Sequence, residues 1–469
     1  MTPDRHPATG RIPAGLRAGP AHVAQGMERR FPNRASQDRT RRHRLREVKT
    51  VALAGAHGGG PGRSARPVPV DCARCVGEGG NQVAHGAARR WTVTRPSVFR
   101  TGGAMAVVAL VTLLASAACA PPTSPYSQVP VYVTSLSGAT QISAGPESAC
   151  ALVAGGTVTC WGAAYPPAGS SPVPVTVAGV SGATQVSAGY GHACAVVVGG
   201  MLRCWGNNSV GQLGNGTTSA NSVPVDVTGV SGATQVAAGE GHSCAVVSGA
   251  VKCWGRDDDG ELGNGTTGGF SATPVDVTGL SGVTQVVADG QSSCALLAAG
   301  AVKCWGANNV GQLGDGTTTG SPTPVDVTGV SGATQITTSG GTACALVAGG
   351  AVKCWGSNQV GNLGNGALNN DPNPTPVDVV GLSGATWVDA GTAETCAVVA
   401  GGAVKCWGSN IYGSLGAWTP TYWSGTPVGV FGIVGATQVS GGRNNVCALL
   451  AAGAAKCWGS DFAGELGNG

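Results

Sequence analysis

Paired cysteines are the residues of this 469-residue chain whose type and spacing most clearly could do chemistry. The stretch CALVAGGAVKC runs from Cys344 to Cys354, and Trp-Gly follows at once. Two thiols at this spacing could bind a metal, take part in redox exchange or form a disulfide. The pattern occurs seven times, as Cys150 and Cys160, Cys194 and Cys204, Cys244 and Cys253, Cys294 and Cys304, Cys344 and Cys354, Cys396 and Cys406, and Cys447 and Cys457.

The spacing of these pairs indicates a repeat architecture. Successive first cysteines are 44, 50, 50, 50, 52 and 51 residues apart. The unit 323–366 contains the strand-like runs PVDV and ATQIT and a hairpin, CALVAGGAVKCWG, which supplies two more strands. No run has helical periodicity. Four short strands per unit and seven units predict an all-β fold, a seven-bladed β-propeller of four-stranded blades.

The hairpin loops favour disulfides over the other cysteine chemistries. A three-residue loop at 348–350 would place Cys344 opposite Cys354, and Gly tolerates the positive φ that such a loop needs. In the third unit the spacing falls to nine, and a two-residue loop, Ser248-Gly249, restores the same register. A cross-strand disulfide requires this register. Buried free thiols and metal ligation are the alternatives, but seven disulfides and an oxidising compartment are the prediction.

The N-terminal part has a different composition. Residues 1–100 hold 19 of the 27 basic residues and 6 of the 23 acidic ones, whereas residues 101–469 are acidic overall. Residues 1–92 lack periodicity and a plausible core, so we interpret them as a disordered leader or as sequence wrongly included by an upstream start, rather than as a nucleic-acid arm. Cys72 and Cys75 form a single CxxC with no second half, and we interpret them as incidental.

Residues 93–120 resemble an export signal. Arg95 and Arg100 precede the apolar stretch Ala104 to Ala118, which is short for a membrane span and suits a signal peptide. The residues SAAC (116–119) resemble a lipobox, in which Cys119 would be the lipidated residue. The alternative is ordinary signal cleavage after the A-x-A pattern at 118–120. Residues 121–127 are then a linker and 128–469 the propeller.

The two ends of the propeller are expected to meet. The last unit stops at Gly469 without the PVDV strand, while a spare copy stands at 128–143, before the first cysteine. We predict that this N-terminal strand completes the last blade and removes an exposed edge.

The segment 187–216 resembles the repeat of the regulator of chromosome condensation family. It has a Gly with a nearby His, an apolar strand, a Gly turn, Trp-Gly, and then NNSVGQLGNG. The resemblance extends over about residues 128–469 and implies a seven-bladed propeller. Only His192 and His242 occupy the family's His position; Ser148, Ser293, Thr342, Thr395 and Val446 stand near it in the other units. The paired cysteines are similar to those of exported bacterial members.

Repeating charged residues are better explained by structure than by ligand binding. Six units place a base before the second cysteine, and acids stand in the following PVDV strand after four of them, so we predict cross-strand pairs. RDDDGELG (256–263) hints at a calcium loop, but Gly255 falls at the first ligand position and a solvated turn is preferred. His192 and His242 are predicted to pack between blades. No cofactor or metal site is predicted.

Residues that break the repeat are the better binding candidates. Unit six carries GAWTPTYWSGTP (416–427), with Trp418, Tyr422 and Trp423, and unit five adds ALNNDPNP (367–374). These aromatics either anchor a ligand or pack on the neighbouring blade.

The function predicted from the sequence is a non-catalytic scaffold, exported and monomeric, that binds an unidentified protein or glycan at the cell envelope. No nucleic acid is expected, and a lipid anchor at Cys119 would hold the scaffold at the membrane. The family resemblance implies two alternatives: a regulator like the family's guanine-nucleotide exchange factor, or a secreted enzyme inhibitor of this propeller type.

Overall fold

The computed structural model describes residues 125–163 and 170–469. The predicted leader (1–92) and signal segment (93–120), with Cys72, Cys75 and Cys119, lie outside the described residues. Strand β1 (Tyr126–Tyr132) begins two residues before the predicted start of the propeller, within the predicted linker.

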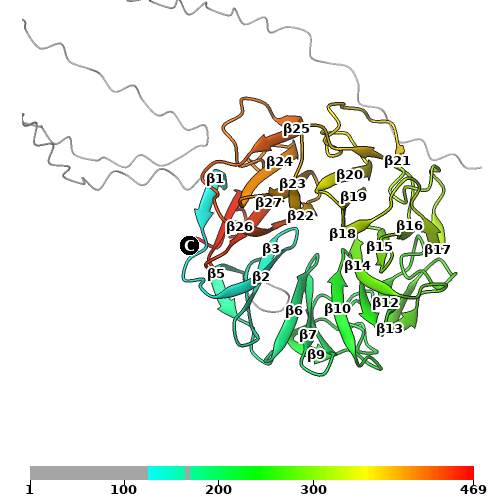
Figure 1. Cartoon of the computed structure of the whole chain (residues 1–469). Coiled ribbons are helices and arrows are strands. Elements are labelled where there is room, and N and C mark those ends of the chain that lie inside the picture. Colours follow the sequence, from blue (N-terminus) through cyan, green and yellow to red (C-terminus); the bar gives the residue numbers. More distant parts are fainter. Residues whose placement is uncertain (1–124, 164–169) are drawn as a thin grey trace, which may run out of the picture. The chain divides into compact units, whose positions relative to one another are not determined.

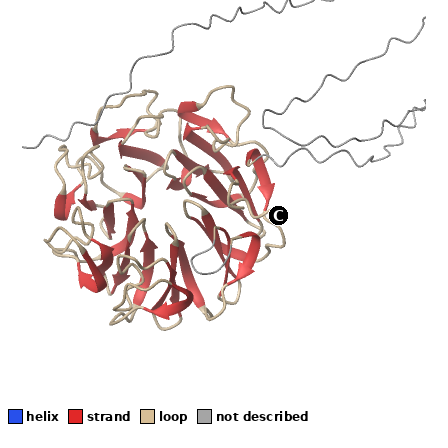
Figure 2. Cartoon of the chain, turned by 180° about the vertical axis from the view of Figure 1, so that it is seen from behind, coloured by secondary structure: helices blue, strands red, loops and turns tan. Residues whose placement is uncertain are grey.

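The described residues form 28 strands in seven four-stranded antiparallel sheets. The sheets stand side by side around a central axis as the blades of a propeller, and strands with loops account for the whole ring (Figures 1 and 2). Within the described residues there is no helix of the length and apolarity that a membrane crossing requires. The predicted seven-bladed all-β fold is therefore confirmed.

Each blade presents its first strand to the axis and buries its second strand most deeply. The first strands alternate buried and exposed residues, while the second strands are buried almost throughout, as expected for a strand covered on both faces. The first strands are β2 (Ala139–Ala144), β6 (Ala183–Ala188), β10 (Ala233–Ala238), β14 (Val283–Asp289), β18 (Ala333–Ser339), β22 (Ala385–Ala390) and β26 (Ala436–Gly441). The second strands are β3 (Ser148–Val153), β7 (His192–Val197), β11 (His242–Val247), β15 (Ser292–Leu297), β19 (Thr342–Val347), β23 (Glu394–Val399) and β27 (Asn445–Leu450).

The third strands carry the Trp-Gly motif and the fourth strands form the outer edge. The third strands are β4 (Thr157–Gly162), β8 (Met201–Gly206), β12 (Ala250–Arg256), β16 (Val302–Gly306), β20 (Ala351–Gly356), β24 (Ala403–Ser409) and β28 (Ala455–Ser460). The fourth strands are β5 (Ser171–Thr176), β9 (Asn221–Asp226), β13 (Phe270–Asp276), β17 (Ser321–Asp326), β21 (Asn373–Asp378), β25 (Trp423–Gly429) and, in the last blade, β1. The outer strands are half exposed, so their register depends less on the core.

All seven predicted cysteine pairs form disulfides between the second and third strands. Their Cα atoms are 4.0–4.1 Å apart, and each pair stands in direct register. The disulfides indicate that the protein folds in an oxidising environment. In chain order the bonds join Cys150 to Cys160, Cys194 to Cys204, Cys244 to Cys253, Cys294 to Cys304, Cys344 to Cys354, Cys396 to Cys406, and Cys447 to Cys457.

The hairpin loops have the backbone conformation that this register needs. Gly349 and Gly350 in the loop of the fifth blade have φ of 89° and 79°. In the shortened loop of the third blade, Ser248 and Gly249 have φ of 52° and 77°. The two-residue loop thus preserves the register of its cysteines, as predicted.

The ring closes between the two ends of the propeller. Strand β1 pairs antiparallel with β28, with Val131 opposite Cys457 and Tyr132 opposite Lys456. The last sheet therefore has the order β1-β28-β27-β26, and the predicted closure is confirmed.

Deleting residues 128–136 from a chain that begins at residue 121 should open this closure. The last blade would lose its outer strand, and β28 would become an unpaired edge. We expect the melting temperature to fall by at least about 5 °C, because the strand pairing and its packing are worth several kcal/mol. Circular dichroism melting of the two chains checks this, and equal melting temperatures would contradict it.

Replacing Cys344 and Cys354 together by alanine should destabilise the propeller without changing its fold. A disulfide that closes a loop of this size contributes about 2–4 kcal/mol, since it restricts the unfolded chain. Denaturant unfolding under non-reducing conditions measures the difference. A reducing agent should bring the parent down to or below the variant, because it opens all seven bonds. A decrease in the free energy of unfolding of less than about 0.5 kcal/mol would show that this disulfide does not stabilise the propeller.

Candidate functional site

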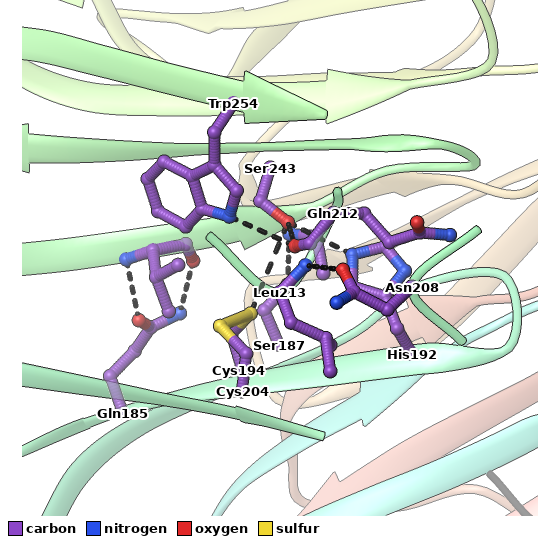
Figure 3. The surroundings of a disulfide bond; sticks show 12 residues. Gln185, Ser187, His192, Cys194, Cys204, Asn208, Gln212, Leu213, Ser243 and Trp254 are labelled. Carbon is purple, nitrogen blue, oxygen red and sulfur yellow. Dashed lines mark hydrogen bonds between the residues drawn. A yellow bond between two sulfur atoms is a disulfide. The ribbon is translucent and has the colours of Figure 1, made fainter. Parts of the chain in front are cut away.

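A ring of side-chain amides joins the first strands around the central axis. In each of six blades a Gln in the first strand donates from Nε2 to a backbone carbonyl of the next blade and accepts at Oε1 from the same residue's N–H. Gln185 does so with Val236, at 2.9 and 2.8 Å (Figure 3). The other five are Gln141, Gln235, Gln285, Gln335 and Gln438. Trp387 takes this position in the sixth blade and makes one bond, to Val439, at 2.9 Å.

This amide ring substitutes for backbone pairing between neighbouring sheets. The first strands of adjacent blades do not pair with each other, so their inward backbone groups need other partners. These glutamines were not among the residues predicted from the sequence to be functional. The sequence signal for them is the Gln that recurs after Thr, in ATQ or VTQ, at the same place in six units.

The Trp-Gly motif joins each blade to the preceding one. Trp254 is fully buried and donates from Nε1 to the carbonyl of Gln212, at 2.9 Å, in the GQLG loop of the preceding blade (Figure 3). It packs in one core cluster with Cys194 and Cys204 of that blade. Gly214 is required here, because a Cβ atom would lie 2.8 Å from the Trp254 Nε1 atom. The motif is structural.

An Asn side chain also holds the GQLG loop. Asn208 accepts from the N–H of Leu213 at 2.9 Å and donates to the carbonyl of Thr217 at 2.9 Å. Asp257 takes its place in RDDDGELG, where Oδ1 accepts from Leu262 N–H at 3.1 Å and Oδ2 accepts from the Thr266 hydroxyl at 3.0 Å. The carboxylate thus completes a turn, but it is buried, whereas the sequence predicted a solvated turn. Among the described residues no group of three or more His, Cys, Asp or Glu could hold a metal ion.

Both histidines lie between blades, as predicted. His192 and His242 are buried, and their Nε2 atoms lie 2.9 and 2.8 Å from the hydroxyls of Ser243 and Ser293 in the following blade. Burial lowers the pKa of His192 to about 4 and, together with the charges of His192 and Arg256, the pKa of His242 to about 3. Both rings are therefore neutral at pH 7 and pack as uncharged polar groups.

The structure defines which residues share the histidine position. It is the first residue of the second strand, opposite the Gly of Trp-Gly. In the other blades it holds Ser148, Ser292, Thr342, Glu394 and Asn445. Ser293, Thr395 and Val446, which the sequence comparison placed near it, are one residue further along. A one-residue shift reverses the side-chain direction in a strand, so the packing partners differ.

Glu394 is the least expected of these side chains. It is fully buried, and neither carboxyl oxygen has a hydrogen-bond partner among the described residues. His192 forms a hydrogen bond with the hydroxyl of Ser243 in the following blade. In the blade that follows Glu394, the position equivalent to Ser243 holds the apolar Val446. Burial raises the pKa of Glu394 well above its usual value, with a further contribution from Asp389. The carboxyl therefore stays protonated in the folded protein at pH values where it ionises in the unfolded chain.

The predicted charge pairs form near the end of the propeller where the disulfide hairpins turn. Lys252 Nζ lies 2.6 Å from the Asp276 carboxylate, in direct register across the third and fourth strands. Equivalent pairs are Arg203–Asp226, Lys303–Asp326 and Lys353–Asp378, at 3.0, 2.7 and 2.8 Å. Lys405, opposite Gly429, and Lys456 donate to backbone carbonyls, and Lys456 also lies 4.5 Å from the Tyr132 ring centroid. Their partly exposed side chains make these pairs worth about 0.2–1 kcal/mol each.

The predicted aromatic residues are exposed. Trp418, Tyr422 and Trp423 are 74%, 69% and 47% accessible, so they do not pack into the neighbouring blade. They belong to the connection between β24 and the start of β25, which also exposes Ile411. Nearby in the fold, Tyr412 makes edge-to-face contacts with Tyr126 and Phe462, at centroid distances of 6.4 and 5.6 Å. In the fifth blade, Leu368 of the ALNNDPNP insertion is also exposed.

These aromatics share one end of the propeller with the mouth of its central channel. Because the strands alternate in direction, the connections after the first and third strands of every blade lie at one end, which we call the loop face. A cavity of about 330 Å³ opens there, lined by residues that include Tyr190, Glu240, Asp289 and Arg443. A second cavity of about 180 Å³ follows the axis between the amide side chains.

Replacing Glu394 by Gln should stabilise the protein more as the pH rises. In the folded parent the pKa of Glu394 is raised. The contribution of Glu394 to the stability of the parent is therefore greatest below its pKa in the unfolded chain, about 4.3, and declines as the pH rises towards its pKa in the folded protein. Gln does not ionise, so the free energy of unfolding of E394Q should gain on the parent by up to about 1.4 kcal/mol per pH unit in this range.

Urea unfolding of E394Q and the parent at pH 4, 6 and 8 measures this effect. E147Q is the matched control, because Glu147 is exposed. A difference between E394Q and the parent that does not change with pH would contradict the burial of a protonated Glu394.

The comparisons with known proteins agree with this architecture. Residues 200–246, 248–296 and 299–346 match the family model of the Regulator of chromosome condensation (RCC1) repeat, and residues 183–212 match a second model of that repeat. The structure is similar to human WBSCR16, with 21% identity, a TM-score of 0.60, and coverage of 71% of this chain and 90% of that one. It is also similar to Prp20p of Saccharomyces cerevisiae, with 18% identity, a TM-score of 0.56, and coverage of 68% and 82%.

At these identities the structural likenesses show the fold alone. A sequence comparison with curated proteins finds no match. The matched segments cover the second to fourth blades and the first two strands of the fifth, and the remaining blades repeat the same strand order and disulfide. This chain is therefore a seven-bladed propeller that contains RCC1 repeats and has one disulfide in each blade.

Proposed function

We propose that this protein is an exported, non-catalytic scaffold that binds another protein through the loop face. The observation that carries the proposal is that Trp418, Tyr422 and Trp423 are exposed on one connection of the propeller. The tryptophans of the Trp-Gly motif, by contrast, are buried. Exposed aromatic side chains are costly in water and are frequent anchors of protein interfaces. A glycan is the alternative ligand, because aromatic rings also stack on sugars.

Export is supported by the disulfides and by the signal-like segment. Seven disulfides persist only in an oxidising compartment, such as the bacterial cell envelope or the extracellular space. In the proposal, residues 93–120 direct export, and Cys119 either carries a lipid that anchors the propeller or is removed with the signal. In the proposal the propeller acts as a monomer, because the edges that its four-stranded sheets leave for pairing with a second copy are short.

A binding role suits the polar groups inside the blades. The buried histidines bond to neighbouring hydroxyls, and Asp257 completes a turn, so these side chains serve packing. Protein binding is also described for a propeller of this fold, since Prp20p is described together with its binding properties to Gsp1p and histones. The surface loops that would carry an exchange-factor or enzyme-inhibitor activity are not encoded by the repeat, so the scaffold role is preferred.

Replacing Trp418 and Trp423 together by alanine should weaken partner binding about 30-fold or more, since two such anchors contribute at least about 2 kcal/mol. Affinity capture from the cell envelope with residues 121–469, which contain every strand of the propeller, would supply the partner. Titration calorimetry would then compare the variant with the parent.

The matched control replaces Val198 and Met201 by alanine, since both are exposed at the disulfide hairpin between β7 and β8 of the second blade. This control should bind like the parent, and both variants should keep the parent's melting temperature. If the Trp418/Trp423 variant binds as tightly as the parent, the loop face is not the binding surface.

A further inference from the structure

Charge is divided unevenly between the two ends of the propeller. Six of its eight basic side chains, from Arg203 to Lys456, lie towards the end opposite the loop face, where the disulfide hairpins turn. Four of the six are paired with a carboxylate, and Lys405 and Lys456 donate to backbone carbonyls. The bases are thus held away from the loop face and are largely compensated where they stand.

The loop face is left strongly acidic. Its two bases are Arg256, 4.0 Å from an Asp258 oxygen, and Arg443. Some of its acids are buried and serve turns or packing, namely Asp257, Glu261, Glu394 and Glu465. The acids at this end that retain solvent access are Glu147, Glu240, Asp258, Asp259, Asp289, Asp315, Asp371, Asp389 and Asp461.

The mouth of the channel concentrates part of this charge. Glu240 and Asp289 line the same cavity of about 330 Å³, and Tyr190 and one base, Arg443, complete its charged and aromatic lining. The Asp289 carboxylate accepts the N–H of Gly340 at 2.6 Å, which fixes its place at the rim. Burial raises the pKa of Asp289 to about 6, and the negative charge of Glu240 adds to this rise. A cation between these carboxylates would relieve the repulsion that they now exert on each other.

The exposed aromatics stand at the same acidic end. Trp418, Tyr422 and Trp423 are exposed to solvent, and Phe462 is 65% exposed in the equivalent loop of the last blade. Aromatic rings next to carboxylates attract ammonium and guanidinium groups, because the ring face carries negative electrostatic potential. A neutral ligand would gain nothing from the acids, whereas a basic one would use both features.

We infer that the partner of the loop face is a protein segment or surface rich in Lys and Arg. The inference rests on the proposed function and specifies its partner class. The acids around the channel mouth attract and orient the basic partner, one basic side chain enters the mouth between Glu240 and Asp289, and the aromatics of the β24–β25 connection pack on the partner's apolar and cationic groups.

The test measures binding of a fluorescein-labelled oligolysine peptide to residues 121–469 by anisotropy. An oligoglutamate peptide and a neutral oligosaccharide serve as the competing probes. Oligolysine should bind, and the other two should not. Its affinity should fall steeply as ionic strength rises from about 0.02 to about 0.2 M, because the screening length shortens.

A pair of charge-matched variants locates the site. The loop-face variant carries E147Q, E240Q and D371N, and the control carries D276N, D326N and D378N at the opposite end. Both remove three negative charges, so they change the net charge equally. The loop-face variant should lose about tenfold or more in affinity, and the control should stay within about twofold.

Three results would overturn the inference: no binding of oligolysine, equal losses in the two charge variants, or equal binding of oligoglutamate. The captured partner separates this failure from that of the proposed function. If its binding depends on Trp418 and Trp423 but not on the loop-face acids, the scaffold proposal stands and the basic partner is wrong. A neutral glycan that depends on the aromatics leads to the same conclusion. If the partner responds to neither variant, both proposals fail.

Discussion

The contact between neighbouring blades is the interaction on which the rest of this structure depends. A single four-stranded sheet cannot bury its own two faces, so each blade must be covered by the next. The chain meets this requirement with a unit that reaches across the gap: the Trp of each blade packs with the disulfide cysteines of the preceding one, as Trp254 does with Cys194 and Cys204. The same arrangement returns at the closure, where Trp161 packs with Cys447 and Cys457.

The amide ring solves the complementary problem near the axis. There the first strands come close to one another without pairing, and their backbone groups would be buried without partners. One Gln per blade supplies a donor and an acceptor at the same point, which is what a peptide group needs. Trp387 can only donate, so the sixth blade loses one of the two bonds. Glu394 and the aromatic connection belong to this same blade, and the repeat is therefore least regular where binding is proposed.

The antiparallel order of the strands separates stability from recognition. Hairpin loops and charge pairs occupy one end, where small glycine turns leave little room for variation. Longer connections occupy the other end, where they can change without disturbing the register of the sheets. The mouth of the channel, the acids without basic partners and the exposed Trp418, Tyr422 and Trp423 all lie there, so the surface that varies between blades is also the surface most suited to a partner.

The sequence by itself determined the repeat, the four strands of each unit, the seven disulfides and the closure by the N-terminal strand. These features are local or periodic. At Ser248-Gly249, for example, the hairpin loop and the cysteine spacing both shorten by one residue, so the register of the two strands can be predicted from the sequence. It also predicted the cross-strand charge pairs, because the residue opposite Lys252 follows from the same register.

Only the tertiary structure decided what happens between blades and on the faces. Gln185 and Val236 are 51 residues apart, and no local pattern says that one side chain completes the other's backbone. The burial of Glu394 and the exposure of Trp418 could not be assigned from their residue types, since either side chain can lie in or out depending on the neighbouring blade. The division of charge between the two ends appeared only when the direction of each strand was known, because residues close in sequence then fall at opposite ends of the ring.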